Sequence, residues 1–365
     1  MRLITLLIIL LATACSSPTE SGDDTIIDKL DSLFLAHVNM NGPGGAFLVA
    51  TGDSVIFSKG YGIADLDSRQ EITTKTLFNL GSISKTFVSN TILILQSEGK
   101  LSVEDSLVKY FSDFKNKDIA RKVKIKHLLT HTSGLPDNRP VSKDSVFYLT
   151  ANDAQNWFPV TQTDTLAFEP GSRYEYSNPA FNGLALIIEE VTGKKWQNVV
   201  ADRIFGPSGM TTSTITDGAH PQSGVAHAYF ESAGKWKEDD YGEEPTFCAA
   251  GNGGVWSSVE ELFNYEKAIK YSQFSTADVL DDARTVKTFP NWKSPASPFI
   301  GWSWFIERTD SGLQTIGHTG TQGGFYCNYV TIPDKELLFI MLCNFPIDRE
   351  CVTKDVLNII EQKSL

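Results

Sequence analysis

The sequence predicts an α+β protein in which an antiparallel sheet, built from both ends of the chain, is flanked by helices and joined to a mainly helical insert. Strand-like runs occur near the N-terminus and again after about residue 300, whereas helical segments with polar loops fill the stretch from about 100 to 234. Because strand-rich ends can complete one sheet and helices must bury an apolar face, we expect terminal helices on the sheet and the insert beside it. The length of 365 residues fits one large domain or two closely joined ones.

The composition is that of an ordinary soluble globular protein, with 41% hydrophobic and 21% charged residues. The formal net charge is -12 at pH 7. A polyanion is repelled by phosphate groups, so we expect neither nucleic acid nor an anionic lipid surface as a partner.

The N-terminus has the pattern of an export signal. One positive charge precedes an apolar run that is too short to span a bilayer, and residues 1–14 are predicted to be a signal peptide. Ala12-Thr13-Ala14-Cys15 resembles the box at which bacterial lipoproteins are cut and lipidated, although Ala12 replaces the usual leucine. Residues 15–24 are acidic and serine-rich and suit a tether. We therefore expect an exported protein of the cell envelope or periplasm, anchored in a membrane only through a lipid on Cys15. A soluble periplasmic or secreted product is the alternative.

Three elements are expected in the first hundred residues. Apolar residues recur at helical spacing near 24–40, which predicts an amphipathic helix. Residues 45–50 and 54–58 flank a Thr-Gly-Asp turn and predict a hairpin. Residues 83–98 are apolar nearly all round, which is typical of a buried helix. We expect that helix to lie between the two halves of the molecule.

The division of the chain follows from this pattern. We assign the α/β part to residues 25–100 and 235–365, and the mainly helical part to residues 101–234, both within one domain. The last part contains four strand-like runs and a closing helix, at residues 302–307, 313–316, 325–332, 337–343 and about 352–360.

Four cysteines remain after Cys15, and two of them lie on adjacent strand-like runs. Counting outward from the turn at 333–336 places Cys327 opposite Leu342 and Cys343 opposite Tyr326. The two sulfurs should point to opposite faces of the sheet, so we expect no structural disulfide framework even in an exported protein.

The residues that carry chemistry form one ordered set of three motifs. Five serines begin an S-x-x-K tetrad, but only Ser82-Ile83-Ser84-Lys85 opens a buried helix after an extended segment. Of two Y-x-N triplets, only Tyr176-Ser177-Asn178 precedes the single [KH]-[ST]-G triplet, His318-Thr319-Gly320. Order and context therefore single out one combination.

These residue types suit the acylation of a serine. Residues three apart share a helix face, so Lys85 can reach Ser82 Oγ, and the helix N-terminus favours a developing oxyanion. A serine hydroxyl needs a neighbouring base, and burial lowers the lysine pKa from about 10.4 toward a usable range. Tyr176 can carry the proton between Ser82, Lys85 and the leaving group. The sequence leaves open whether Lys85 or Tyr176 is the general base.

With these motifs the chain resembles the serine β-lactamase and penicillin-binding superfamily, in the branch of class C β-lactamases, D-alanyl-D-alanine carboxypeptidases, D-aminopeptidases and related esterases. The resemblance implies a β-lactamase/transpeptidase-like fold. It also implies an oxyanion hole made by the backbone N–H groups of Ser82 and Thr321, beside Thr319 and Gly320. Asn178 would hold the substrate amide or Lys85, and Asn344 would contact the substrate. Further matching segments lie at residues 81–87, 127–135, 251–256 and 317–324.

Two departures from the class C pattern concern the substrate. His318 stands where those enzymes carry a lysine that holds the substrate carboxylate, and a histidine is only partly charged near neutral pH. Ile347 stands where a second asparagine would help to hold the same group. Both changes favour a peptidase or esterase over an efficient β-lactamase.

We therefore predict an exported serine hydrolase that acts through an acyl-enzyme on Ser82, on a D-amino-acid peptide or an ester. A class C-like β-lactamase is one alternative, and a catalytically silent protein that binds peptidoglycan fragments or a partner is another. The expected partner is a small-molecule or peptide substrate, with no metal and no organic cofactor. His127 and His131 are spaced like a metal pair but lack the glutamate of H-E-x-x-H.

Overall fold

The computed structural model describes residues 22–140, 147, 150–215, 221, 223–239 and 250–361, with the backbone alone at 22–25. The predicted signal peptide, Cys15 and Cys248 lie outside the described residues. The last residues assigned to the tether, 22–24, already belong to the first helix, α1 (Gly22–His37).

A six-stranded antiparallel sheet joins the two ends of the chain. The strand order is β10-β11-β12-β13-β1-β2, and the N-terminal strand β1 pairs with the C-terminal strand β13. The predicted fold class is therefore confirmed. The strands are β1 (Gly45–Thr51), β2 (Ser54–Tyr61), β10 (Phe305–Arg308), β11 (Gln314–Gln322), β12 (Phe325–Ile332) and β13 (Leu337–Cys343).

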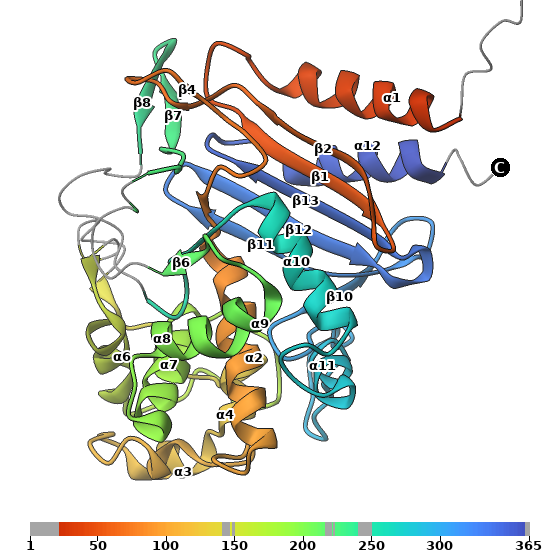
Figure 1. Cartoon of the computed structure of the whole chain (residues 1–365). Coiled ribbons are helices and arrows are strands. Elements are labelled where there is room, and N and C mark those ends of the chain that lie inside the picture. The colour runs from red at the N-terminus through yellow and green to blue at the C-terminus, as the bar shows by residue number, and fades with distance from the viewer. Residues whose placement is uncertain are drawn as a thin grey trace, which may run out of the picture.

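The sheet is covered on both faces (Figure 1). Helices α1 and α12 (Arg349–Glu361) lie on one face, and α10 (Val259–Lys270) lies on the other. All seven residues of β13 are buried, which explains why that strand is apolar without alternation. Cys327 pairs with Leu342 and Cys343 with Tyr326, as the turn count predicted, and the two thiols lie in separate apolar cores.

The buried helix α2 (Ser84–Ser97) runs from the sheet into the helical half of the molecule (Figure 1). Every residue from Ser84 to Leu95 is buried, and α2 contacts α7 (Asn178–Thr192), α8 (Trp196–Val200) and α11 (Ala277–Ala283). A short 3-10 turn, η1 (Gly81–Ile83), precedes it and packs against β11. The first turn of α2 therefore lies where the sheet meets the helices.

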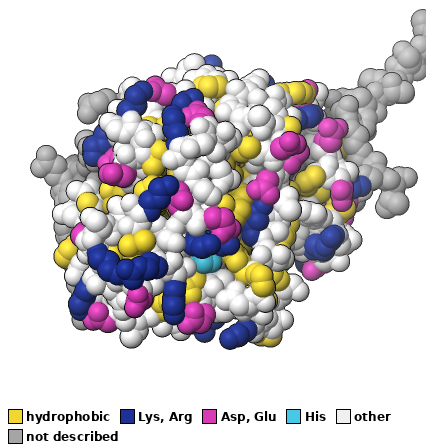
Figure 2. All heavy atoms as spheres, turned by 90° about the horizontal axis from the view of Figure 1, so that it is seen from below, with side chains coloured by type: hydrophobic (Ala, Val, Ile, Leu, Met, Phe, Trp, Pro, Cys, Tyr) yellow, Lys and Arg dark blue, Asp and Glu magenta, His cyan; other side chains and the backbone are white. Residues whose placement is uncertain are grey.

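The helical half and its small sheets complete the fold. Figure 2 shows Lys and Arg side chains intermingled with Asp and Glu on the face seen from below. Among the helices of the described ranges, none has the length and apolar character needed to cross a membrane. The remaining elements are β3 (Ile63–Asp65), β4 (Gln70–Glu71), β5 (Phe78–Asn79), η2 (Leu107–Lys109), α3 (Lys117–Lys122), α4 (Ile125–Leu129), α6 (Asp153–Thr161), η4 (Ala201–Phe205), α9 (Gly206–Ser208), β6 (Thr214–Ile215), β7 (Tyr229–Ser232), β8 (Lys235–Glu238), β9 (Val255–Ser257) and η5 (Pro333–Lys335).

Candidate active site

Three of the predicted residues meet at one serine oxygen. Lys85 Nζ lies 2.9 Å from Ser82 Oγ, and Tyr176 OH lies 2.9 Å from the same atom. Ser82 belongs to η1, Lys85 to the first turn of α2, and Tyr176 to the loop that Ser177 ends by capping α7. Both neighbours of Ser82 are groups that can exchange a proton with it.

Two glycines let the β11 backbone approach the serine turn closely. Gly81 has φ +51, and a Cβ there would lie 2.7 Å from Thr321 N. A Cβ on Gly320 would lie 1.9 Å from the carbonyl oxygen of Leu80. The backbone of Thr321 therefore lies directly against the turn that carries Ser82.

Arg349, in the first turn of α12, holds the same end of β11. Its Nη1 donates to the Gly320 carbonyl at 2.6 Å and to Thr321 Oγ1 at 2.9 Å. No motif marked this arginine, because the contact joins a helix and a strand that are paired only in the folded chain.

The lysine is fully buried and has no carboxylate bound to it among the described residues. Its Nζ donates to Ser82 Oγ and, at 2.6 Å, to the backbone carbonyl of Asn252. Burial, helped by the positive charge of Arg139, holds the pKa of Lys85 well below its usual value. A lysine of this kind has a larger neutral fraction at moderate pH and can accept a proton.

His131 supports the tyrosine through its ring and through its Nδ1 atom. Its ring stacks on Tyr176 with centroids 4.4 Å apart, and its Nδ1 accepts from the Ser177 N–H at 3.0 Å. Burial and the nearby Lys85 hold the pKa of His131 well below its usual value, so the ring is neutral. His127 Nδ1 accepts from the Lys124 N–H and so caps α4. Within the described ranges, no group of three or more potential metal ligands gathers.

His318 is buried beside the site and carries no charge at neutral pH. Burial and Lys85 lower its pKa to about 3. Its Nδ1 hydrogen-bonds to the Thr319 carbonyl at 2.6 Å, and its ring meets Phe305 edge-on with centroids 4.9 Å apart. The partial charge expected from the sequence is thus absent, and this position provides no cation for a substrate carboxylate.

The two predicted asparagines have different surroundings. Asn178 begins α7, but the second hydrogen bond of Lys85 goes to the Asn252 carbonyl. Asn344 is fully buried, its Oδ1 accepts from the Gly44 N–H, and its Nδ2 donates to the carbonyls of Ile63 and His227. Asn344 therefore holds the end of β13, and its contact with the substrate stays a prediction.

A buried carboxyl group near the site was missed by sequence reasoning. Asp153 is the first residue of α6, and its side chain points inward to three donors, on Gly251, Asn182 and Trp196. The Asn152-to-Gln155 capping box marks the start of this helix in the sequence. Nothing in that box indicates that the next side chain turns into the core.

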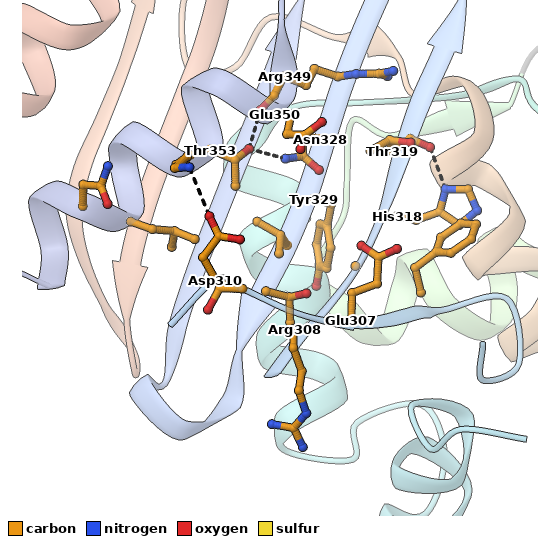
Figure 3. Close-up of a pocket in the computed structure, with 18 of the residues that line it drawn as sticks. Glu307, Arg308, Asp310, His318, Thr319, Asn328, Tyr329, Arg349, Glu350 and Thr353 are labelled. Atoms are coloured by element: carbon orange, nitrogen blue, oxygen red, sulfur yellow. Dashed lines mark hydrogen bonds and ion pairs between the residues drawn. The ribbon is translucent and has the colours of Figure 1, made fainter. Parts of the chain in front are cut away.

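A separate cavity of about 910 Å³ lies between α12 and strands β10 to β12. Figure 3 shows Glu307, Arg308 and Asp310 on one side of it and Glu350 and Thr353 on the other. Its lining includes His318 and Thr319, whereas Ser82, Lys85 and Tyr176 do not line it. It is therefore a neighbour of the serine site and not its centre.

The fold and this arrangement of serine, buried lysine and tyrosine are those of a serine hydrolase. Residues 30–362 match the sequence profile of the Beta-lactamase family, and the chain belongs to that family. The resemblance seen in the sequence is thus confirmed.

Individual relatives are distant. The chain is 25% identical to penicillin-binding protein 4* of Bacillus subtilis over 325 residues, covering 84% of this chain and 69% of the relative. It is 27% identical to a D-aminopeptidase of Brucella anthropi, covering 86% of this chain but only 58% of that enzyme. The octameric penicillin-binding protein homologue from Pyrococcus abyssi has the same fold, with a TM-score of 0.77 and 22% identity over 93% of this chain and 76% of that one.

Proposed function

We propose that this protein forms an acyl-enzyme on Ser82 and hydrolyses a D-amino-acid peptide or amide, or an ester. The observation that carries the proposal is that Ser82 Oγ lies 2.9 Å from both a buried lysine amine and a tyrosine hydroxyl. Both neighbours are in position to take the serine proton without any rearrangement of the chain.

The proposed reaction has two balanced halves. Ser82 Oγ attacks the substrate carbonyl carbon and passes its proton to the Lys85–Tyr176 pair. The amine or alkoxide then leaves with a proton from that pair, and an ester on Ser82 remains. In the second half, water gives a proton to the pair and attacks the ester, and Ser82 recovers its proton as the acid departs.

The developing oxyanion is assigned to the N–H groups of Ser82 and Thr321, with Thr319 and Gly320 on the adjoining edge of β11. This assignment is supported by the close approach of Thr321 to Gly81. Asn178, at the start of α7, is proposed to contact the substrate amide.

The choice of substrate rests on His318 and on the relatives. A neutral, buried imidazole where class C β-lactamases hold a lysine disfavours substrates that need a carboxylate anchor there. The similarity to a D-aminopeptidase of Brucella anthropi favours a D-amino-acid amide or peptide. We further propose, from the N-terminal sequence alone, that the protein is exported and lipidated on Cys15. Labelling with a radioactive fatty acid, compared between wild type and Cys15→Ser, tests this.

The test of function is intact-protein mass spectrometry after incubation with a fluorophosphonate and, separately, with a penicillin. The comparison is between wild type and Ser82→Ala. A fluorophosphonate adduct confined to wild type supports the activated serine. A persistent penicillin adduct indicates a penicillin-binding peptidase, rapid penicillin turnover a β-lactamase, and no penicillin reaction an amidase or esterase. The absence of any adduct on wild type contradicts the proposal and favours a silent binding protein.

A further inference from the structure

We infer that Asp153 is a positioning residue for Lys85, acting through the turn at Gly251 and Asn252. The inference rests on the proposed function, in which Lys85 exchanges a proton with Ser82. It adds that Asp153, on helix α6, helps to hold Lys85 of helix α2 in position.

The Asp153 side chain is buried, and both oxygen atoms of its carboxyl group accept hydrogen bonds. Its Oδ1 accepts from the Gly251 N–H at 2.7 Å and from Asn182 Nδ2 at 2.8 Å. Its Oδ2 accepts from Trp196 Nε1 at 2.9 Å. The carboxyl group is therefore held by the helix α7, the helix α8 and the turn at once.

The turn connects this group to the lysine. Asn182 Nδ2 also lies 3.2 Å from Asn252 Oδ1, so both residues of the turn are bonded on the Asp153 side. On the other side, the Asn252 carbonyl accepts from Lys85 Nζ at 2.6 Å. A Cβ on Gly251 would lie 2.4 Å from the Phe181 carbonyl oxygen, so the turn is also pressed against α7.

Such a support matters because of the lysine side chain itself. Its amine sits at the end of a flexible four-carbon stem, and burial alone does not choose where the amine points. The Asn252 carbonyl selects the direction that also reaches Ser82 Oγ. A shift of the turn by about 1 Å is enough to cost a reaction about 10²-fold when it misplaces a catalytic group.

The experiment measures the rate of fluorophosphonate labelling of Ser82 between about pH 5 and pH 10 in folded protein. Asp153→Ala is expected to lower the plateau rate by about 10–100-fold. The labelling rate rises with pH as Lys85 loses its proton, and in Asp153→Ala this rise should occur at lower pH. The reason is that the Lys85 ammonium group is less stable in its charged form when it loses the carbonyl acceptor. Trp196→Phe is the matched control. It removes the indole N–H that donates to the Asp153 carboxyl group, and this N–H makes no bond to the turn at Gly251 and Asn252. This variant should lower the midpoint of thermal unfolding, while the pH at which the labelling rate rises stays unchanged.

A second pair of variants keeps the test sharp if Asp153→Ala does not fold. Asp153→Asn must direct its NH₂ at either the turn or the Trp196 indole N–H, whereas Asp153→Asn with Trp196→Phe removes that conflict. The double variant should label faster than Asp153→Asn alone.

The inference is overturned if the labelling rate rises at the same pH in every Asp153 variant and wild type, and the rates follow only the fraction of folded protein. Asp153 would then be a structural residue. Wild type that does not label, or Lys85→Ala that labels normally, overturns the proposed function and this inference with it. Wild type that labels and loses the rate with Lys85→Ala, but not with Asp153→Ala, overturns the inference alone.

Discussion

Two cations in this protein, Lys85 fully buried and Arg284 with a side chain 12% exposed, lie in opposite electrostatic surroundings. Arg284, at the end of α11, makes a two-point ion pair with Glu266 of α10, with N–O distances of 2.8 and 2.6 Å. Burial opposes the charge of Arg284, yet Glu266 outweighs it and the guanidinium pKa is raised. Lys85 has a serine hydroxyl and a carbonyl as its bonded acceptors, and burial lowers its pKa.

The difference shows how burial produces two kinds of group. A buried charge with a matched carboxylate stays charged and ties helices together, as Arg284, Glu266 and the Tyr329 hydroxyl tie α11, α10 and β12. A buried amine with only neutral acceptors loses its preference for the proton and becomes a base. The following predictions separate these roles, from the largest expected effect to the smallest.

Replacing Lys85 should remove function and spare the fold. Lys85→Ala should lower the acylation rate by about 10²–10⁴-fold, the usual contribution of a general base. Lys85→Arg should be equally poor, because a guanidinium does not give up its proton in proteins. Labelling kinetics measure the rate, and circular dichroism checks that the fold is kept. Normal labelling of Lys85→Arg would show that the group acts only as a positive charge.

Replacing one member of the ion pair should have the opposite effect. Glu266→Gln leaves Arg284, whose side chain is only 12% exposed, without its partner and should cost at most about 3–5 kcal/mol in the free energy of unfolding. The labelling rate of the molecules that remain folded should be unchanged. Denaturant unfolding measures the loss. The double variant Glu266→Gln with Arg284→Met should recover most of the lost free energy of unfolding. If it does not, the unpaired charge of Arg284 is not the cause of the loss.

The stability of the protein should depend on the charge of Asp153. Burial raises its pKa from 3.8 to about 7, against the hydrogen bonds from Gly251, Asn182 and Trp196. A raised folded-state pKa means that its contribution is fully present below about pH 4 and is lost as pH rises through about 7. A shift of this size corresponds to about 4 kcal/mol at most. Unfolding free energies at low and high pH, compared between wild type and Asp153→Asn, measure it. The stability of wild type relative to the variant should fall with rising pH, and a rise would contradict the assigned pKa.

The smallest of the four expected effects is a change in substrate preference when a cation is placed at position 318. His318→Lys restores the residue type that class C enzymes use to hold a carboxylate, and a new charge contact should increase the reactivity with penicillin by about tenfold. The ratio of penicillin to neutral-ester acylation rates measures the change. His318→Gln is the matched neutral control and should leave that ratio unchanged; an equal gain in both variants would exclude charge as the reason.

Much of the architecture was predictable because it is encoded locally. Counting outward from the turn at 333–336 predicted the pairing of Cys327 with Leu342, and the structure has that register. The apolar character of residues 83–98 predicted the buried helix, observed as α2 at Ser84–Ser97. The three motifs predicted Ser82, Lys85 and Tyr176, which the fold brings together around one oxygen atom.

The parts that could not be predicted are contacts between residues far apart in the chain. Asn344 lies at the strand end where the sequence placed it, but its amide is used by four backbone groups of the fold. The charge state of His318 was open until its burial was known. Residue type alone does not state whether a polar side chain faces a substrate or the core.

The sequence by itself thus determined the elements, the family and the order of the reactive residues, since periodicity and motif spacing act over a few turns of chain. The tertiary structure decided the environment of those residues. Lys85 meets the carbonyl of Asn252, 167 residues away, and Asp153 meets Gly251, 98 residues away. Burial and hydrogen bonding between such distant segments set the pKa and direction of a side chain, and both exist only once the chain has folded.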